Sequence, residues 1–392
     1  MKKDRVFKNL VWRIFGFALV LVQAAVSLLF VAALYRMQIF EAWIVVLAAV
    51  IFALLVGGCA VPVFVKKKPI ITTRILCIAV SFMCAVCGAF ALRYMWAFNN
   101  FLDKVSLADG SSEVVETGID ITAEPFIVYL SGSDSRTNVD DPTARSDVNI
   151  LMVVNPVRHK LLLVSIPRDT YVQLHGTTGL RDKLTHAGLN NNIALSKATL
   201  EDFLGIEISY TVKVSFDTVV QVVDELDGID IYSDTEMLLG TESKTDGKKK
   251  CYFYVGTQHV DGDCALRFAR ERKTYGRGDR HRGENQQEVL TAIINKFLSS
   301  KDYLLRLPEI LEIAADSFET SFARDDISSF LRFQLANGSS WQIKSIGLDG
   351  VGDMLPTYTY GEDMPLWVMI PDEDSYAKVI ATIDEYLKVD GK

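Results

Sequence analysis

Residues 148–166, VNILMVVNPVRHKLLLVSI, contain two almost continuous apolar runs separated by a short polar turn. Runs of this length that are apolar at nearly every position are typical of strands buried on both faces of a sheet. A similar run, FIVYL at 126–130, precedes them, and YTVKV (210–214), IDI (229–231) and WQIKSIG (341–347) follow them. We therefore expect these six segments to be strands.

Segments with helical periodicity separate the expected strands. They lie at about 193–204, 216–226, 285–298, 303–314, 325–336 and 372–388. This alternation predicts an α/β (α+β) sandwich with a central mixed sheet flanked by helices. Residues 233–250 show neither period, and we expect them to form a surface excursion.

The first hundred residues have a different character. Three apolar runs, at about 10–34, 42–65 and 70–98, are each long enough to cross a hydrocarbon core, which takes roughly 20 residues. The first run has no small-residue cleavage site, so we expect an anchor rather than a removable signal peptide. The sequence therefore predicts three transmembrane helices ahead of the sandwich.

The distribution of charge orients these helices. Five basic side chains lie in the first 13 residues and four in the loop at 65–74, but the loop between the first two runs has only Arg36. The positive-inside rule then places the N-terminus in the cytoplasm and everything after residue 98 outside the cell. We expect a membrane anchor over residues 1–98, an extracellular linker over 99–124 and an extracellular domain over 125–392.

The outer part of the chain is acidic. The first 98 residues carry 11 basic and 2 acidic side chains, whereas the remainder carries 30 and 47. An acidic domain is a poor partner for nucleic acid, so a cluster of arginines within it indicates a local pocket. Its two cysteines, Cys251 and Cys264, favour one disulfide in an oxidising compartment, and two buried free thiols are the alternative.

Residues 267–287, RFARERKTYGRGDRHRGENQQ, contain six arginines and Lys273 within sixteen positions. Arg270 and Arg272 are two residues apart and cannot share a helix face, so a helix end or a turn at Gly276 and Gly278 must bring them together. Converging guanidinium groups suit phosphate oxygens, which accept bidentate hydrogen bonds. The segment therefore indicates a phosphate site.

The helix after this cluster strengthens the indication. We expect its N-terminus near Gly283, which would place Arg280 and Arg282 where backbone N–H groups already favour an anion. The alternative is a basic surface patch with ion pairs to Glu271, Asp279 and Glu284.

Polar residues also stand at the ends of the expected strands, where α/β folds place their sites. Asp134 follows the first strand, Arg145 and Asp147 open the second, Arg168 and Asp169 follow the third, and Lys183 and His186 lie further on. Asp134 and Asp147 could share Mg²⁺, which prefers oxygen ligands. Either aspartate alone could instead belong to a turn or a cap, and His186 could be a hydrogen-bonded core residue.

Five motifs in this order resemble a known family. SGSDSR (131–136), RSDVNILMVV (145–154), SIPRDTYV (165–172), RDKLTHAG (181–188) and ALRFARERKTYGRGDRHRGENQQ (265–287) are similar to the LytR-CpsA-Psr family of Gram-positive cell-envelope proteins. The likeness covers about residues 125 to 345. The three apolar runs resemble the capsule-linked members of streptococci, and Asn285 stands where many members have arginine.

The resemblance implies a phosphotransferase of cell wall biogenesis. Such enzymes move a glycopolymer, capsular polysaccharide or a teichoic-acid-like polymer, from undecaprenyl pyrophosphate to a peptidoglycan hydroxyl. It implies a multi-pass protein of the cell membrane whose catalytic domain is extracellular. Its partners would be the lipid-linked polymer, peptidoglycan and the membrane, but not nucleic acid.

The resemblance also assigns roles to residues of this chain. Asp134 and Asp147 would hold Mg²⁺. The diphosphate would be clamped by Arg168, Arg270, Arg272 and Arg282 with Gln286 beside them, supported by Arg145 and Lys183. The residues implied to act in catalysis are Asp134, Asp147, Arg168, Arg270, Arg272, Asp279 and Arg282.

Two other functions remain open at this stage. A polyprenyl-pyrophosphate hydrolase would use the same clamp with water as the acceptor. A non-enzymatic envelope regulator or lipid-binding sensor would need only the lipid site, and one that contacts DNA would need more than the short cytoplasmic segments expected here. Clustered arginines with a cation suit both enzymes, since phosphoryl transfer to either acceptor depends mainly on positioning and charge neutralisation, and the resemblance favours the transferase.

Overall fold

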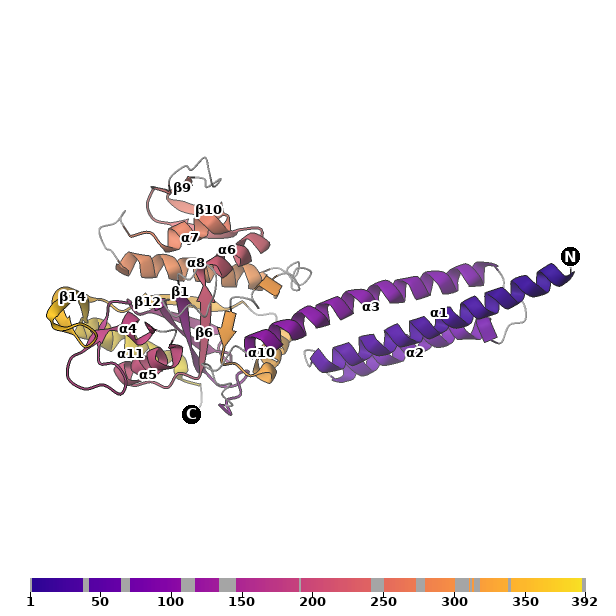
Figure 1. Ribbon diagram of the computed structural model, residues 1–392, viewed down its shortest axis with the longest axis horizontal. Helices are drawn as coiled ribbons and strands as arrows, with labels where there is room; N and C mark the ends of the chain where they lie inside the picture. The colour runs from indigo at the N-terminus through magenta and orange to yellow at the C-terminus, as the bar shows by residue number, and fades with distance from the viewer. Residues whose placement is uncertain are drawn as a thin grey trace. The chain divides into compact units, whose positions relative to one another are not determined.

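The computed structural model describes residues 2–37, 42–64, 71–106, 117–133, 146–189, 192–240, 250–272, 279–299, 310, 312–313, 318–337 and 340–389. The chain divides into two compact units, Met1–Asn100 and Phe101–Lys392. Each unit is described separately below (Figure 1).

The first unit is built from long helices, α1 (Lys2–Met37), α2 (Ala42–Phe64) and the greater part of α3 (Ile71–Ser106). Within the described residues, three segments are long and apolar enough to cross a membrane: Arg13–Arg36, Ala42–Val61 and Ile75–Phe101. Large apolar side chains such as Leu28, Leu54 and Phe82 are more than two-thirds exposed, as lipid-facing residues would be. These features fit a membrane protein.

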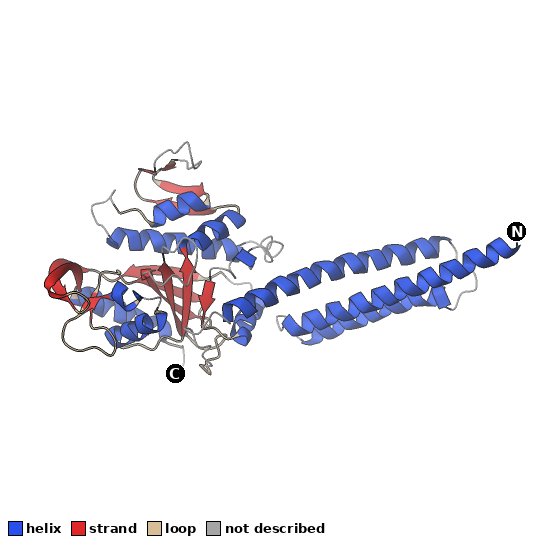
Figure 2. Ribbon diagram, viewed as in Figure 1, coloured by secondary structure: helices blue, strands red, loops and turns tan. Residues whose placement is uncertain are grey.

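The second unit is organised around a mixed sheet. Within the described residues it has six strands in the order β11-β6-β1-β2-β3-β12, and β1 pairs in parallel with β6 and β3 with β12, while the remaining pairs are antiparallel. The strands are β1 (Phe126–Ser133), β2 (Ser146–Asn155), β3 (Lys160–Ser165), β6 (Tyr210–Ser215), β11 (Phe318–Thr320) and β12 (Gln342–Gly347). Figure 2 shows helices on both faces of this sheet.

Burial on both faces explains the continuous apolar runs of the central strands. On one face, Leu151 and Leu162 pack with residues of α4 (Leu184–Ala187), α5 (Ile193–Leu204) and α11 (Glu373–Leu387). On the other face, Ile150 and Leu163 pack with residues of α8 (Asp279–Ser299) and α10 (Arg324–Asn337). Neighbouring residues of β2 and β3 therefore point into different cores, and all of these positions must be apolar. The expected α/β sandwich with a mixed central sheet is confirmed.

A smaller layer lies beyond α8. It contains α6 (Phe216–Glu225), α7 (Gly262–Ala269) and the strands β7 (Ile229–Ser233), β8 (Met237–Leu239), β9 (Cys251–Phe253) and β10 (Gly256–Val260). β7 pairs with β10 and β8 with β9, and their inward residues form a core with Phe268 and Val289. The expectation of a plain surface excursion over 233–250 was wrong for residues 237–239, since Met237 and Leu239 are buried.

The structure adds two short pairings that the sequence did not indicate. β4 (Tyr171–Val172) pairs with β5 (Asp182–Lys183), and β13 (Gly350–Thr357) forms a hairpin with β14 (Gly361–Pro371). Of the helix expected over 303–314, residues 310, 312 and 313 are helical and the rest lies outside the described residues.

A disulfide joins Cys251 of β9 to Cys264 of α7, with Cα atoms 5.6 Å apart. It fixes the outer strand pair to the helix that ends at Ala269, immediately before Arg270. The bond therefore braces the element that leads into the arginine cluster.

Labelling of the denatured, unreduced full chain should find four free thiols, those of Cys59, Cys77, Cys84 and Cys87. Replacing both Cys251 and Cys264 by serine should lower the free energy of unfolding of the outer unit by about 3 kcal/mol, because the unfolded chain gains loop-closure entropy. Cys87→Ser is the control and should leave it unchanged. Six reactive thiols in the unreduced protein would contradict the bond.

Candidate functional site

The site lies at one edge of the main sheet, which the strand register defines. Ser133 at the end of β1 pairs with Ser146 at the start of β2 and with Ser215 at the end of β6. Ser165, the last residue of β3, pairs with Ile150 of β2 and with Gly347, the last residue of β12. The carboxyl ends of four strands and the amino end of β2 therefore meet at this edge.

Buried hydrogen bonds fix the start of β2 at this edge. The Ser146 hydroxyl donates to Asn149 Oδ1 at 2.8 Å and lies 2.9 Å from the Ser131 hydroxyl of β1. Tyr129 donates from its hydroxyl to the same Asn149 Oδ1 at 2.6 Å. Burial raises the pKa of Tyr129, so the phenol remains a neutral donor. This network holds in place the backbone that carries Asp147.

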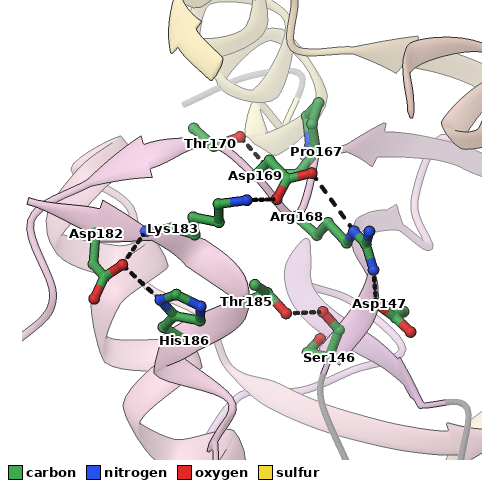
Figure 3. A network of polar contacts seen from close by, with 10 residues as sticks. All are labelled: Ser146, Asp147, Pro167, Arg168, Asp169, Thr170, Asp182, Lys183, Thr185 and His186. Carbon is green, nitrogen blue, oxygen red and sulfur yellow. Dashed lines mark hydrogen bonds and ion pairs between the residues drawn. The ribbon is translucent and has the colours of Figure 1, made fainter. Parts of the chain in front are cut away.

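Four charged side chains of alternating sign form a chain across the edge (Figure 3). Arg168 Nη1 donates to Asp147 Oδ1, and Arg168 Nε lies 3.6 Å from Asp169 Oδ2. Lys183 Nζ donates to Asp169 Oδ1 at 2.8 Å. Arg168 and Asp147 expose 26% and 22% of their side chains, whereas Asp169 exposes 10%. The two cations are therefore pre-positioned yet accessible to an incoming anion.

The loop after β3 holds these side chains rigidly. Thr170 N donates to Pro167 O at 3.0 Å, which closes a turn around Arg168 and Asp169. Thr185 N donates to Arg168 O at 2.9 Å, and the Thr185 hydroxyl donates to Ser146 O at 3.0 Å. The start of β2, the Arg168 turn and α4 are thus joined by hydrogen bonds.

Asp182 anchors the neighbouring strand β5 and is completely buried. Its Oδ1 accepts hydrogen bonds from Lys183 N at 2.7 Å and from His186 Nδ1 at 2.6 Å, and its Oδ2 accepts from Thr359 N at 2.8 Å and from the Thr359 hydroxyl. Burial by itself would raise the pKa of Asp182, but the donors from His186 and Thr359 outweigh it and hold the pKa below its usual value. His186 is thus a buried, hydrogen-bonded residue.

The arginine cluster reaches the same edge from two helices. The Arg270 guanidinium lies 5.3 Å from the centroid of the Phe216 ring, and Phe216 directly follows β6. A Cβ atom at Gly283 of α8 would come within 2.5 Å of Ser165 Oγ, so glycine allows this helix to approach the end of β3. Arg282 is the preceding residue and is buried. Arg272 is exposed and Gln286 partly exposed.

The start of α8 differs from the expectation. The helix begins at Asp279 rather than near Gly283, so Arg280 and Arg282 lie inside its first turn. Arg280 pairs with Asp349, and its Nε lies 3.6 Å from Glu284 Oε1. For Arg280 the structure favours the surface ion pairs that the sequence left as the alternative.

Asn285, where the family resemblance leads us to expect arginine, is buried and donates to Phe268 O at 2.9 Å. It fixes α8 against the end of α7. Asn285 therefore has a packing role, whereas an arginine at this position would be expected to contact phosphate. Gln287 has a similar role, since its Nε2 donates to Leu163 O at 2.9 Å and to Ile346 O at 2.7 Å.

Several expected site residues lie outside the described part of the chain. Asp134 and Arg145 adjoin Ser133 and Ser146 in sequence, but they fall in the gap between β1 and β2, and Asp279 is described only as the first residue of α8. Sequence reasoning placed Asp169 at a strand end near the expected site but assigned it no role there, and it did not single out Asp182. The sequence signal that could have indicated their roles is an acidic residue next to a basic one beside a buried segment, as in the motifs PRD and RDK.

The candidate magnesium site is described only in part. No group of three or more histidine, cysteine, aspartate or glutamate side chains that could hold a metal occurs among the described residues. Mg²⁺ commonly uses one or two carboxylates and completes its shell with phosphate oxygens and water. The partly exposed Asp147 carboxylate could supply one ligand of that set, and a phosphate bound by the neighbouring basic side chains could supply others.

Comparison with known proteins identifies relatives. Residues 99–367 match the model of the LytR_cpsA_psr family. The polyisoprenyl-teichoic acid–peptidoglycan teichoic acid transferase TagV of Bacillus subtilis (strain 168) is 30% identical over 296 residues, which cover 72% of this chain and 72% of that protein. TagU of Bacillus cereus (strain ATCC 14579), a transferase of the same description, is 32% identical over 266 residues, covering 66% and 83%.

Solved structures give the same result. The crystal structure of B. subtilis TagV is 29% identical, with a TM-score of 0.54 over 67% of this chain and 97% of that chain. The structure of TagT bound to LIIa-WTA is 27% identical, with a TM-score of 0.53 over 73% and 100%. With described residues of these motifs at one sheet edge and this agreement in sequence and fold, the chain is a member of the LytR_cpsA_psr family.

Proposed function

We propose that this protein is a phosphotransferase that moves a glycopolymer from undecaprenyl pyrophosphate to a hydroxyl of peptidoglycan. The observation that carries the proposal is that Arg168, Lys183, Arg270 and Arg282 come from separate elements to one sheet edge, where Asp147 pairs with Arg168. The relatives TagV and TagU are named as transferases of teichoic acid to peptidoglycan. A teichoic-acid-like polymer or a capsular polysaccharide would fit the same site.

The reaction moves one phosphoryl group. The acceptor oxygen bonds to the phosphorus that carries the polymer, and the bond from that phosphorus to the bridging oxygen breaks. Polyprenyl phosphate leaves with the electron pair of that bond, and the proton of the acceptor hydroxyl passes to the departing phosphate or to solvent. Negative charge on the transferred and leaving oxygens must be neutralised throughout.

The arginines are suited to that task because each guanidinium can donate two parallel hydrogen bonds to phosphate oxygens. Arg168 and Lys183 are held by Asp147 and Asp169 before the donor arrives, so little reorganisation is required when it binds. Arg270 and Arg272 would approach the diphosphate from the end of α7, and Arg282 with Gln286 from α8. Arg145 would join them from the start of β2, and Asp279 would orient the arginines.

A magnesium ion completes the proposed site. Asp147, together with Asp134, would hold it, and when bound it would neutralise phosphate charge as a Lewis acid. Asp147 would then have two tasks, because it also positions Arg168, which would orient the donor.

The anchor explains access to the lipid carrier. We propose that the three apolar helices span the cell membrane with the N-terminus in the cytoplasm, over residues 1–98. The linker over 99–124 would then be extracellular, and the catalytic domain over 125–392 would meet both the lipid-linked polymer and the wall. The asymmetry of basic residues between the loops supports this topology.

Arg270→Ala and Arg272→Ala should each reduce transfer of a labelled lipid-linked polymer to peptidoglycan by about 100- to 1000-fold, by analogy with a lost oxyanion donor. Lysine at either position should not restore the rate, because a point charge cannot reproduce the bidentate fork. Arg158→Ala, in the turn between β2 and β3 at the opposite edge of the sheet, is the matched control and should transfer normally. Folded Arg270 and Arg272 variants that transfer at the wild-type rate would rule out the clamp.

Asp147→Asn should reduce transfer, and the rate should recover in part as Mg²⁺ is raised, because added cation compensates for weaker recruitment. Chelation with EDTA should stop the wild-type reaction, and Mg²⁺ should restore it. Asp202→Asn, on the exposed surface of α5, is the control. If magnesium neither supports the wild-type rate nor relieves the variant, Asp147 acts only by positioning Arg168.

A further inference from the structure

The β13–β14 hairpin exposes a group of large apolar side chains. The following residues, from both strands and the turn, are between 43% and 67% exposed: Val351, Met354, Tyr358, Tyr360, Met364 and Trp367. Apolar patches of this kind on a soluble domain commonly mark a binding surface. Figure 1 shows the hairpin at the margin of the outer unit, where β14 is labelled.

Hydrogen bonds join the hairpin to the candidate site along its length. At its base, Met369 N donates to Asp169 O at 2.8 Å. Midway, the Tyr171 hydroxyl donates to Pro356 O at 2.8 Å, and at the turn Tyr358 N donates to Arg181 O at 3.0 Å. Thr359 is held by the buried Asp182 carboxylate. The hairpin is thus fixed beside the β4–β5 pair that carries Lys183.

Trp367 has the geometry of a stacking platform. It stands opposite Met354 across the hairpin, and a Cβ atom at Gly352 would come within 2.6 Å of its indole ring. The absence of a side chain at Gly352 therefore lets the indole lie against the strand, and the residue remains 47% exposed. Tyr360, whose ring centroid is 5.7 Å from that of His186, continues the aromatic surface toward the site.

The charge around the hairpin selects among partners. The hairpin itself, residues 350–371, contains Asp353, Glu362 and Asp363 but no lysine or arginine. This negative surface disfavours an anionic polymer, a phosphate-bearing lipid headgroup or nucleic acid. An uncharged saccharide meets no such repulsion, and its hydroxyls can donate hydrogen bonds to carboxylates while its apolar ring face packs on an aromatic ring.

We propose that the outward face of the β13–β14 hairpin binds the acceptor, a glycan strand of uncharged pyranose rings, with Trp367 and Tyr358 as the stacking residues. This rests on the proposed transfer reaction, which requires an acceptor next to the charged edge. The basic residues at the sheet edge would then face the anionic donor, and the acidic, aromatic hairpin would face the acceptor.

Binding of N-acetylglucosamine oligomers, which are strands of uncharged pyranose rings, to the full chain in detergent micelles tests the proposal by isothermal titration without donor. Trp367→Ala should raise the Kd about tenfold, because a central aromatic contact is lost, while Trp367→Phe should stay within about threefold of the wild type. Tyr254→Ala is the matched control, since this exposed tyrosine lies next to β9 in the other layer, and its Kd should not change.

An unchanged Kd in folded Trp367→Ala overturns the proposal. It is also overturned if that substitution converts a dimer to a monomer, which would assign the hairpin to self-association.

The proposed function is tested separately by binding and turnover of the lipid donor. If the protein binds glycan through Trp367 but never transfers polymer, the acceptor-binding surface is retained and the transferase function is ruled out. If Trp367→Ala transfers polymer with an unchanged KM for the acceptor, the transferase is retained and the acceptor-binding surface on the hairpin is ruled out.

Discussion

The site depends on keeping several cations close together before any anion is bound. Two unit charges of like sign 4 Å apart repel by on the order of 4 kcal/mol at an effective dielectric constant of 20. The chain resolves this by alternating the signs: Asp147, Arg168, Asp169 and Lys183 follow one another across the edge of the sheet. The same carboxylates limit how far the cations can move, so the edge is ordered without its ligand.

The rest of the outer unit supports this arrangement. Buried hydrogen bonds of Ser146 and Asn149 fix the start of β2, and those of Asp182 fix β5. Gly283 permits α8 to approach Ser165, and Gln287 fastens that helix to the carbonyl groups of β3 and β12. The contacts of Gly283 and Gln287 join α8 to strands far away in the sequence, which is how arginines of this helix reach the same edge as Arg168.

Much of the fold was predictable because its dominant signal is local. The central strands are buried on both faces, and this produces the unbroken apolar runs at 126–130, 148–154 and 160–166. The β13–β14 hairpin could not be predicted in the same way. Several of its large apolar residues face solvent, and it is held by hydrogen bonds to remote residues such as Tyr171 and Asp182, so it has no periodic pattern of its own.

The site, like the fold, was predictable where its signal is local in sequence and unpredictable where it depends on remote contacts. Spacing alone indicated that the arginines form a cluster, but it could not assign each of them, since a guanidinium that binds phosphate and one that pairs with a carboxylate look alike in sequence. Arg280 pairs with Asp349, 69 residues away in the chain, and Asn285 bonds to the backbone of Phe268. Such partners are set by tertiary packing.

The outer unit thus presents surfaces of opposite character, a basic sheet edge and an acidic, aromatic hairpin, joined through Asp169 and Asp182. The reaction in ¹⁸O-labelled water tests the central claim most directly, because transfer and hydrolysis differ in which oxygen reaches phosphorus. The full chain is supplied with lipid-linked polymer and peptidoglycan, and the phosphate of both products is analysed by mass spectrometry. The account predicts polymer bound to peptidoglycan and polyprenyl phosphate that are both free of ¹⁸O. Polymer phosphate released with one ¹⁸O atom, and none bound to peptidoglycan, would contradict it and identify a hydrolase.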